Sequence, residues 1–301
     1  MAQSESRNRN LIAKLRDHAD ALGSMATSDR LPVNLNIIAQ RLRVTAVEFQ
    51  PLLVSAMLST HPEGFRIFVK SEVDRVEDLR KRFESEAPKA LLPTKVRFSI
   101  AHELAHALLY NLAGVGKSIP REKRNFRAGG GKTKLSILER QCDRIAGHLL
   151  MPSPIWEREI GSLKSVAPEE LLGLARRAGV SVEALVIRLD ECEDLFVDRY
   201  FKGCIAVVER FSDRIVVKSV ARPRRLNIAK ELRFVRSGEV WQVQRDDGTA
   251  AINGEECGEV DMLLTIETRL SSEKVKHRLR FLRYSSFEQK QSYLLSVAVC
   301  K

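Results

Sequence analysis

The sequence lacks any long run of apolar residues, and this absence excludes a class of protein. None of its hydrophobic stretches reaches the roughly 20 residues that a helix needs to cross a bilayer. Residues 1–10 (MAQSESRNRN) are polar, and no apolar segment of the kind found in signal peptides follows them. We therefore expect a soluble, cytoplasmic protein with no membrane partner.

Cysteine is also scarce: there are five, and no two of them have the spacing C-x-x-C. An odd number without that spacing favours neither a disulfide framework nor a zinc site made of thiolates. Cys142 stands closest to other residues of interest. Its simplest interpretation is a small buried apolar side chain.

Acidic residues are outnumbered by basic ones, 39 to 50, which gives a net charge of +11 and a pI near 9.6. Such a surface suggests an acidic partner, either nucleic acid or an acidic protein, although many charged runs are simply solvated. One basic run, residues 117–134, contains Glu122 as its only acid, and could act as a lid that engages an acidic substrate. Two further clusters are formed by Arg222, Arg224 and Arg225, and by Lys274, Lys276, Arg278 and Arg280.

Residues 97–110 (RFSIAHELAHALLY) contain the pattern H-E-x-x-H. A helix is predicted here, because no Pro or Gly interrupts the segment and apolar residues recur at helical spacing: Ile100, Leu104, Ala107 and Leu108. His102 and His106 then project from one face, where both could bind one Zn²⁺. Glu103 could take a proton from the attacking water and return it to the leaving amine. The pattern indicates a zinc peptidase; the alternatives are a chance match and two ordinary surface histidines.

A catalytic zinc site needs three protein ligands and one open position. Glu122 lies in the Gly-rich basic run, which cannot by itself fix a carboxylate. Glu139 lies in LSILERQCDRIAGHLLMP, a predicted helix that Pro152 ends, and is the better candidate. Asp143 shares its face, as a carboxylate that orients a ligand histidine would. His148 is expected on the opposite face, as a packing or substrate-side residue.

Together, RFSIAHELAHALL and E-x-x-C-D-x-x-A-x-x-L-L-M-P resemble the ImmA/IrrE metallopeptidases, and the resemblance covers about residues 31–189. It implies an α+β, zincin-like core with a small sheet and an H-E-x-x-H helix. It also implies a zinc endopeptidase that cuts a protein substrate, a transcriptional repressor of the helix-turn-helix class, in stress or mobile-element regulation. His102, His106 and Glu139 match the metal ligands, and Glu103 matches the general base. The sequence departs from the family pattern at Asp143, often Asn in the family, and in a longer connection over residues 71–94.

The sequence leaves two parts of the site undecided. Zinc is the expected metal, but sites with two histidines and a carboxylate also accept Mn²⁺ and Fe²⁺. Tyr110 and His148 are the candidates for stabilising the oxyanion, and nothing in the sequence chooses between them.

Around this centre we expect an N-terminal helix within residues 1–30, a metallopeptidase domain at 31–192 and a C-terminal β-rich domain of unknown role at 193–301. Four local predictions concern what surrounds the metal helix. Gly23 is predicted to close the first helix, and Thr94 to cap the helix that carries His102 and His106. Residues 65–69 are predicted to be the edge strand that receives an extended substrate. Residues 74–86 are predicted to be a solvent-facing helical insertion.

Two alternatives to a peptidase stay open: a DNA-binding regulator with a structural metal site, and a protein that sequesters a repressor without cutting it. Residues 168–189 look like a helix-turn-helix around Gly179. The second of these helices is too apolar to read bases, so we favour a structural pair.

Overall fold

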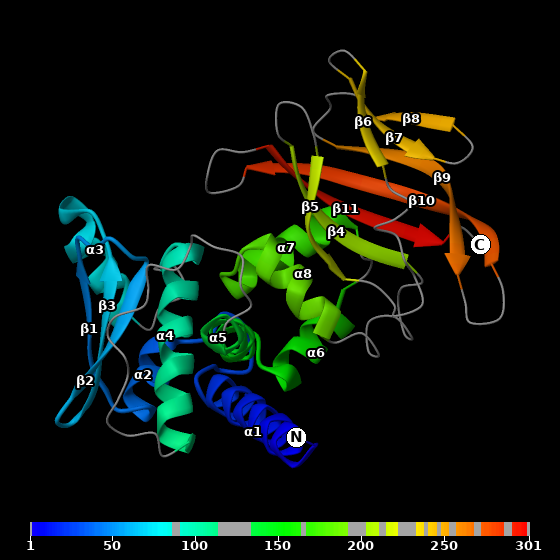
Figure 1. Ribbon diagram of the computed structural model, residues 1–301. Helices are drawn as coiled ribbons and strands as arrows, with labels where there is room; N and C mark the ends of the chain where they lie inside the picture. The colour runs from blue at the N-terminus through cyan, green and yellow to red at the C-terminus, as the bar shows by residue number, and fades with distance from the viewer. Residues whose placement is uncertain are drawn as a thin grey trace. The chain divides into compact units, whose positions relative to one another are not determined.

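The computed structural model describes residues 2–85, 91–113, 134–163 and 167–191, followed by strands between residues 203 and 299 (Figure 1). The chain forms two compact units, Met1–Arg158 with Arg177–Val180, and Glu159–Arg176 with Ser181–Lys301. Among the described helices, none combines the length and apolarity that a bilayer crossing demands.

The first unit contains a three-stranded sheet of β1 (Val44–Gln50), β2 (Ala56–His61) and β3 (Gly64–Lys70). β2 and β3 form an antiparallel hairpin, while β1 pairs with β3 in parallel. The strand order is therefore β1-β3-β2, with β3 in the centre. The prediction that residues 65–69 form an edge strand is wrong, because β3 is hydrogen-bonded on both sides. The free edges belong to β1 and β2.

Gly64 allows β3 to start close against the residue that precedes β1. Its φ is 151°, and a Cβ at this position would lie 2.0 Å from the carbonyl oxygen of Arg43. The same oxygen accepts a hydrogen bond from the Phe65 N–H at 2.9 Å. A side chain at residue 64 would therefore disturb the first contact between β1 and β3.

Helix α4 (Thr94–Ala113) lies between this sheet and helix α5 (Lys134–Leu150), as Figure 1 shows. It contacts β2 and β3 on one side and α5 on the other. The predicted apolar stripe is confirmed, since all four of its residues are buried: Ile100, Leu104, Ala107 and Leu108. The elements around α4 and α5 are α1 (Ala2–Met25), α2 (Leu35–Arg41), a short 3₁₀ turn (Val73–Arg75) and α3 (Val76–Glu84).

Helix α1 packs against α5 and α4, and it continues past Gly23 to Met25. The prediction that Gly23 closes this helix is wrong. A Cβ on Gly23 would lie 2.8 Å from the carbonyl oxygen of Leu149 and 3.1 Å from the Cβ of Pro152. Glycine serves here to let α1 approach the end of α5, a role that local sequence does not reveal.

The start of α4 also differs from its prediction. The Pro93 carbonyl accepts the Arg97 N–H at 2.9 Å, so Thr94 is the first helical residue rather than the capping residue before it. The Arg97 side chain is buried and donates to two backbone carbonyls, Val33 at 2.9 Å and Gly179 at 3.2 Å. Burial lowers the pKa of Arg97 to about 10, which leaves the guanidinium charged at neutral pH. These hydrogen bonds connect the first turn of α4 to two segments that are distant from it in sequence.

Helix α3 is only partly the solvent-facing insertion that the sequence predicts. One face carries surface ion pairs such as Arg82–Asp78 at 2.9 Å. The other face buries Leu79 and Phe83, and the Phe83 ring packs edge-on against Phe49 of β1, with centroids 6.4 Å apart. The helix thus covers part of the sheet.

Three short helices follow α5: α6 (Ser153–Gly161), α7 (Pro168–Ala178) and α8 (Val182–Glu191). Gly179, between α7 and α8, has a positive φ of 63°. Helix α8 buries Val182, Leu185, Val186 and Leu189. This burial is what the apolar pattern predicts for a structural helix.

Beyond residue 203 the described segments are strands that pair in two sheets. The larger has the order β5-β4-β11-β10-β9 and the smaller the order β6-β7-β8, and α8 contacts β4 and β5. The bounds are β4 Gly203–Arg210, β5 Ile215–Ala221, β6 Arg233–Ser237, β7 Val240–Arg245, β8 Gly248–Ile252, β9 Cys257–Glu267, β10 Ser272–Ser285 and β11 Gln291–Val299. The division into domains at residues 30 and 192 stays a prediction.

Candidate metal centre

The two histidines of the H-E-x-x-H pattern project from one face of α4, four residues apart. Their rings lie edge to face, with centroids 4.9 Å apart and an interplanar angle of 70°. The Nε2 atoms of His102 and His106 are 3.2 Å apart. The helix therefore brings two imidazole nitrogens to one point, as the spacing predicts.

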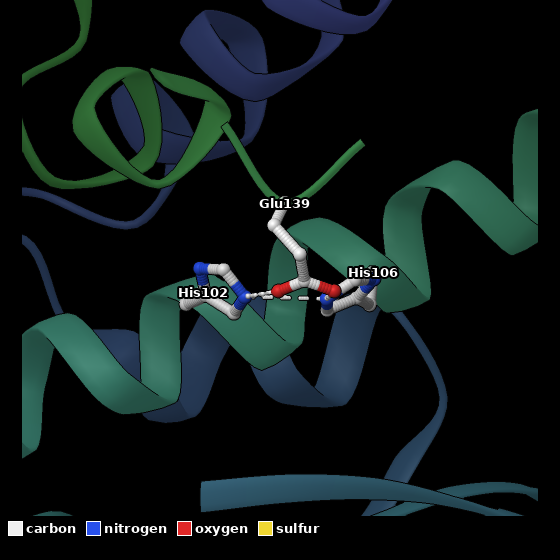
Figure 2. Close-up of side chains that lie close together, drawn as sticks. All are labelled: His102, His106 and Glu139. Carbon is white, nitrogen blue, oxygen red and sulfur yellow. Dashed lines mark hydrogen bonds and ion pairs between the residues drawn. The ribbon is translucent and has the colours of Figure 1, made fainter. Parts of the chain in front are cut away.

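Helix α5 delivers a carboxylate to the same point. Glu139 Oε2 lies 3.1 Å from His102 Nε2, and Glu139 Oε1 lies 3.6 Å from His106 Nε2. Figure 2 shows the carboxylate of Glu139 facing both imidazoles. The ligand atoms of the three residues all lie within 4.8 Å of one another. The preference for Glu139 over the other downstream acids therefore agrees with the geometry.

These separations fit a single divalent cation. On a tetrahedral zinc ion with bonds of about 2.0–2.1 Å, two ligand atoms lie about 3.3–3.4 Å apart. The two nitrogens and the carboxylate are also all electron-pair donors when the imidazoles are neutral. A cation between them would balance a cluster whose members otherwise repel one another. The chemistry and spacing of His102, His106 and Glu139 thus suit the expected zinc.

Asp143 contacts the outer ring nitrogen of His102. Nδ1 of His102 donates to the Asp143 carboxylate at 2.8 Å, and Nε2 faces Glu139 and His106. Burial lowers the pKa of His102, but hydrogen bonds to Asp143 and Glu139 raise it more, to about 9. Hydrogen bonds from His102 and His106 hold the pKa of Glu139 far below its usual range.

Cys142 contacts the other histidine, a feature that sequence reasoning missed. Its buried Sγ lies 3.4 Å from Nδ1 of His106. Burial, aided by the charges of Glu139, Asp143 and Glu103, raises the pKa of this thiol far above its usual range. The available signal was spacing, since Glu139, Cys142 and Asp143 occupy positions i, i+3 and i+4 of one helix face.

Glu103 is buried, with 4% of its surface exposed. Its negative charge helps to raise the pKa values of His102 and Cys142. Aromatic residues lie one turn before and one turn after the histidine pair. The Phe98 ring is 6.5 Å from that of His102, and the Tyr110 ring is 6.2 Å from that of Phe65 on β3.

The hydrogen bonds of His148 point to a different part of the unit. Its Nδ1 lies 3.0 Å from Asp20 Oδ1 on α1. Asp20 also accepts hydrogen bonds from the Ser153 N–H at 2.9 Å and the Ser153 hydroxyl at 2.6 Å. The structure thus groups His148 with the junction of α1, α5 and α6. Glu122, the basic run up to residue 133, and Arg222, Arg224 and Arg225 lie outside the described residues.

The family comparison covers the segment that carries this geometry. Residues 89–190 match the family model of the IrrE N-terminal-like domain, Peptidase_M78. This segment is therefore similar to the IrrE N-terminal-like domain. The match confirms the resemblance to the ImmA/IrrE family, and the domain contains both helices of the candidate metal centre. The family match is also consistent with the α+β core of helices and a small sheet.

Other comparisons add little to the IrrE N-terminal-like assignment. No curated protein matches the chain. Among solved structures, a Mycobacterium tuberculosis transcriptional regulator aligns with 97% of this chain and 77% of its own, at 15% identity and a TM-score of 0.47. A similarity of that size does not establish a common fold.

Proposed function

We propose that the protein is a zinc-dependent endopeptidase that hydrolyses a peptide bond in a protein substrate. The observation that carries this proposal is the convergence of His102, His106 and Glu139 from two helices, with the buried carboxylate of Glu103 beside them. A metal site that only stabilised the fold would not need a further buried acid next to its ligands.

In this mechanism, Glu103 and Asp143 assist the metal ion in different ways. A bound zinc ion would polarise the scissile carbonyl and lower the pKa of a water molecule toward neutrality. Glu103 accepts a proton from the attacking water and returns it to the leaving amine nitrogen. Asp143 keeps the proton of His102 on Nδ1, so that Nε2 stays available as a ligand.

For the oxyanion we favour Tyr110 over His148. Tyr110 is one helical turn after His106 and so follows the ligand face of α4. The His148 imidazole, by contrast, is engaged by Asp20 at 3.0 Å. Exchanging Tyr110 for Phe should lower kcat with little change in KM if its hydroxyl stabilises the transition state.

We propose that the substrate binds in an extended conformation along β2, the free edge of the sheet that contacts α4. Backbone hydrogen bonds to that edge would position a peptide with little demand on its side chains. The resemblance to ImmA/IrrE proteins favours a helix-turn-helix repressor as the substrate. Such a repressor acts in the cytoplasm, where the cleavage would occur.

The test uses the full-length protein, zinc and the repressor from the neighbouring locus. Wild-type protein should yield two repressor fragments by mass spectrometry, and chelation of the metal should stop the reaction. Glu103→Gln should bind zinc normally but lower the cleavage rate by a factor of about 10²–10⁴. Full activity in this variant would remove Glu103 as the general base.

The same samples separate the alternatives. A stable complex without fragments would favour sequestration of the repressor. No fragments, combined with duplex DNA binding that weakens steeply with salt, would favour the DNA-binding alternative.

A further inference from the structure

One turn of α5 carries a metal ligand and the partners of both ligand histidines. Glu139 faces the two Nε2 atoms, Asp143 contacts Nδ1 of His102, and Cys142 contacts Nδ1 of His106. Both outer contacts reach the nitrogen that points away from the metal position. The two histidines are therefore oriented from the same helix, but by different chemistry: a carboxylate for one and a thiol for the other.

The contact at His106 decides which nitrogen carries the proton. If Nδ1–H donates to Sγ, the lone pair of Nε2 is free to bind a cation. If the thiol donates to Nδ1, the proton moves to Nε2 and His106 cannot be a ligand. Nε2 of His106 lies 3.2 Å from His102 Nε2 and 3.6 Å from Glu139 Oε1, and only the first arrangement lets it share one cation with those two groups.

We propose that Cys142 is a positioning residue for His106: its sulfur accepts the Nδ1–H and holds the ring with Nε2 toward the metal. This inference rests on the proposed metal site. Cys142 has none of its surface exposed, so water does not compete for this hydrogen bond. A neutral acceptor on His106, opposite the charged acceptor on His102, also avoids a fourth carboxylate within a site that already has Glu103, Glu139 and Asp143.

The experiment compares Cys142→Ala with Cys142→Ser in the full-length protein. Zinc affinity is measured by competition with a chromophoric chelator. The alanine variant should bind zinc about 10-fold to 100-fold more weakly, as found when partners of ligand histidines are removed. Serine keeps an acceptor on a shorter arm, so its affinity should lie between those of alanine and the wild type.

A matched control separates positioning from packing. Ile145→Val removes one buried methylene group from the same helix and should lower stability without changing zinc affinity. Circular dichroism and thermal unfolding of the metal-free proteins verify that all variants fold. Long-range ¹H–¹⁵N spectra of the metal-free protein report the tautomer of His106 directly. They should show a larger share of the Nδ1-protonated tautomer in the wild type than in Cys142→Ala.

The outcomes are distinguishable. If wild-type protein binds zinc and Cys142→Ala binds it equally well with the same tautomer, the positioning role is overturned and the proposed function stands. Serine that performs no better than alanine would also overturn the hydrogen-bond explanation. If the wild type binds no divalent metal, both proposals fail.

Discussion

Helix α5 takes part in two Asp–His pairs of nearly identical local geometry. At one place, Nδ1 of His102 lies 2.8 Å from Asp143; at the other, Nδ1 of His148 lies 3.0 Å from Asp20. Both pairs join α5 to a neighbouring helix of the same unit, α4 in the first case and α1 in the second. In both, the imidazole is largely shielded from solvent, with 17% and 8% of the side chain exposed.

The difference lies in what else the two pairs contact. The second nitrogen of His102 faces two more ligand groups, whereas Asp20 uses its remaining capacity on the backbone and hydroxyl of Ser153. The second network completes the start of α6, whose first residue is Ser153. An Asp–His pair therefore does not by itself mark a reactive site. A reactive site is marked instead by the convergence of further electron-pair donors on the same point.

Removing the third ligand should have the largest effect. Glu139→Ala leaves two imidazoles, and zinc affinity should fall by more than about 100-fold, beyond the loss expected for an outer partner. His148→Asn, a change in the second pair, should leave zinc affinity within about twofold of the wild type. Isothermal titration or chelator competition measures both. A comparable loss in His148→Asn would show that the two networks are not independent.

The two aspartates should differ when each is replaced by alanine. Asp143→Ala removes the acceptor that orients His102, so zinc affinity should fall about 10-fold to 100-fold. Asp20→Ala should lower the unfolding temperature with little effect on zinc affinity, because it removes the carboxylate that accepts hydrogen bonds from His148 and Ser153. The comparison fails if zinc affinity responds equally to both substitutions.

Zinc binding should depend on pH through His102. The pKa of this imidazole is raised to about 9 in the metal-free protein, and the cation must displace its proton. Apparent affinity should therefore rise about 10-fold per pH unit below pH 9. Metal-free stability should change in the opposite sense, because a raised histidine pKa stabilises the fold fully below about 6.5 and this stabilisation is lost as the pH rises through 9. Chelator competition and thermal unfolding from pH 6.5 to 9 test both trends, and a flat affinity profile would contradict them.

The smallest effect is expected at the edge of the second pair. Ser153→Ala removes one hydroxyl that donates to Asp20 at 2.6 Å but keeps the backbone N–H bond. The free energy of unfolding should fall by about 1 kcal/mol, measured by urea denaturation. The pKa of Asp20 is lowered because its hydrogen bonds outweigh its burial, so its contribution is present above pH 3.8 and lost in acid. The difference between variant and wild type should accordingly shrink toward low pH.

The sequence was informative where function depends on spacing along a helix. The positions of His102 and His106 and the contact of Asp143 follow from four-residue spacing on a helix, and the choice of Glu139 follows from its place on a predicted helix. The structure places each of these side chains as the spacing predicts. Their catalytic roles stay proposals.

The sequence was misleading where the outcome depends on which elements become neighbours. β2 and β3 could be recognised as a hairpin, but nothing local shows that β1 pairs in parallel with β3 and makes it the central strand. Cys142 was predicted to be a buried apolar residue, and it is buried. That its sulfur meets His106 depends on how α5 packs against α4, which no single segment encodes.

The close approach at Gly23 has a practical consequence for dissecting this protein. The α1 backbone reaches the last turn of α5 there, so a segment at the start of the chain supports the helix that presents Glu139, Cys142 and Asp143. A fragment trimmed to residues 89–190 would lack α1 and the sheet that covers the other side of α4. Such a fragment would keep every ligand in its sequence and still be a poor test of whether the intact chain binds a metal.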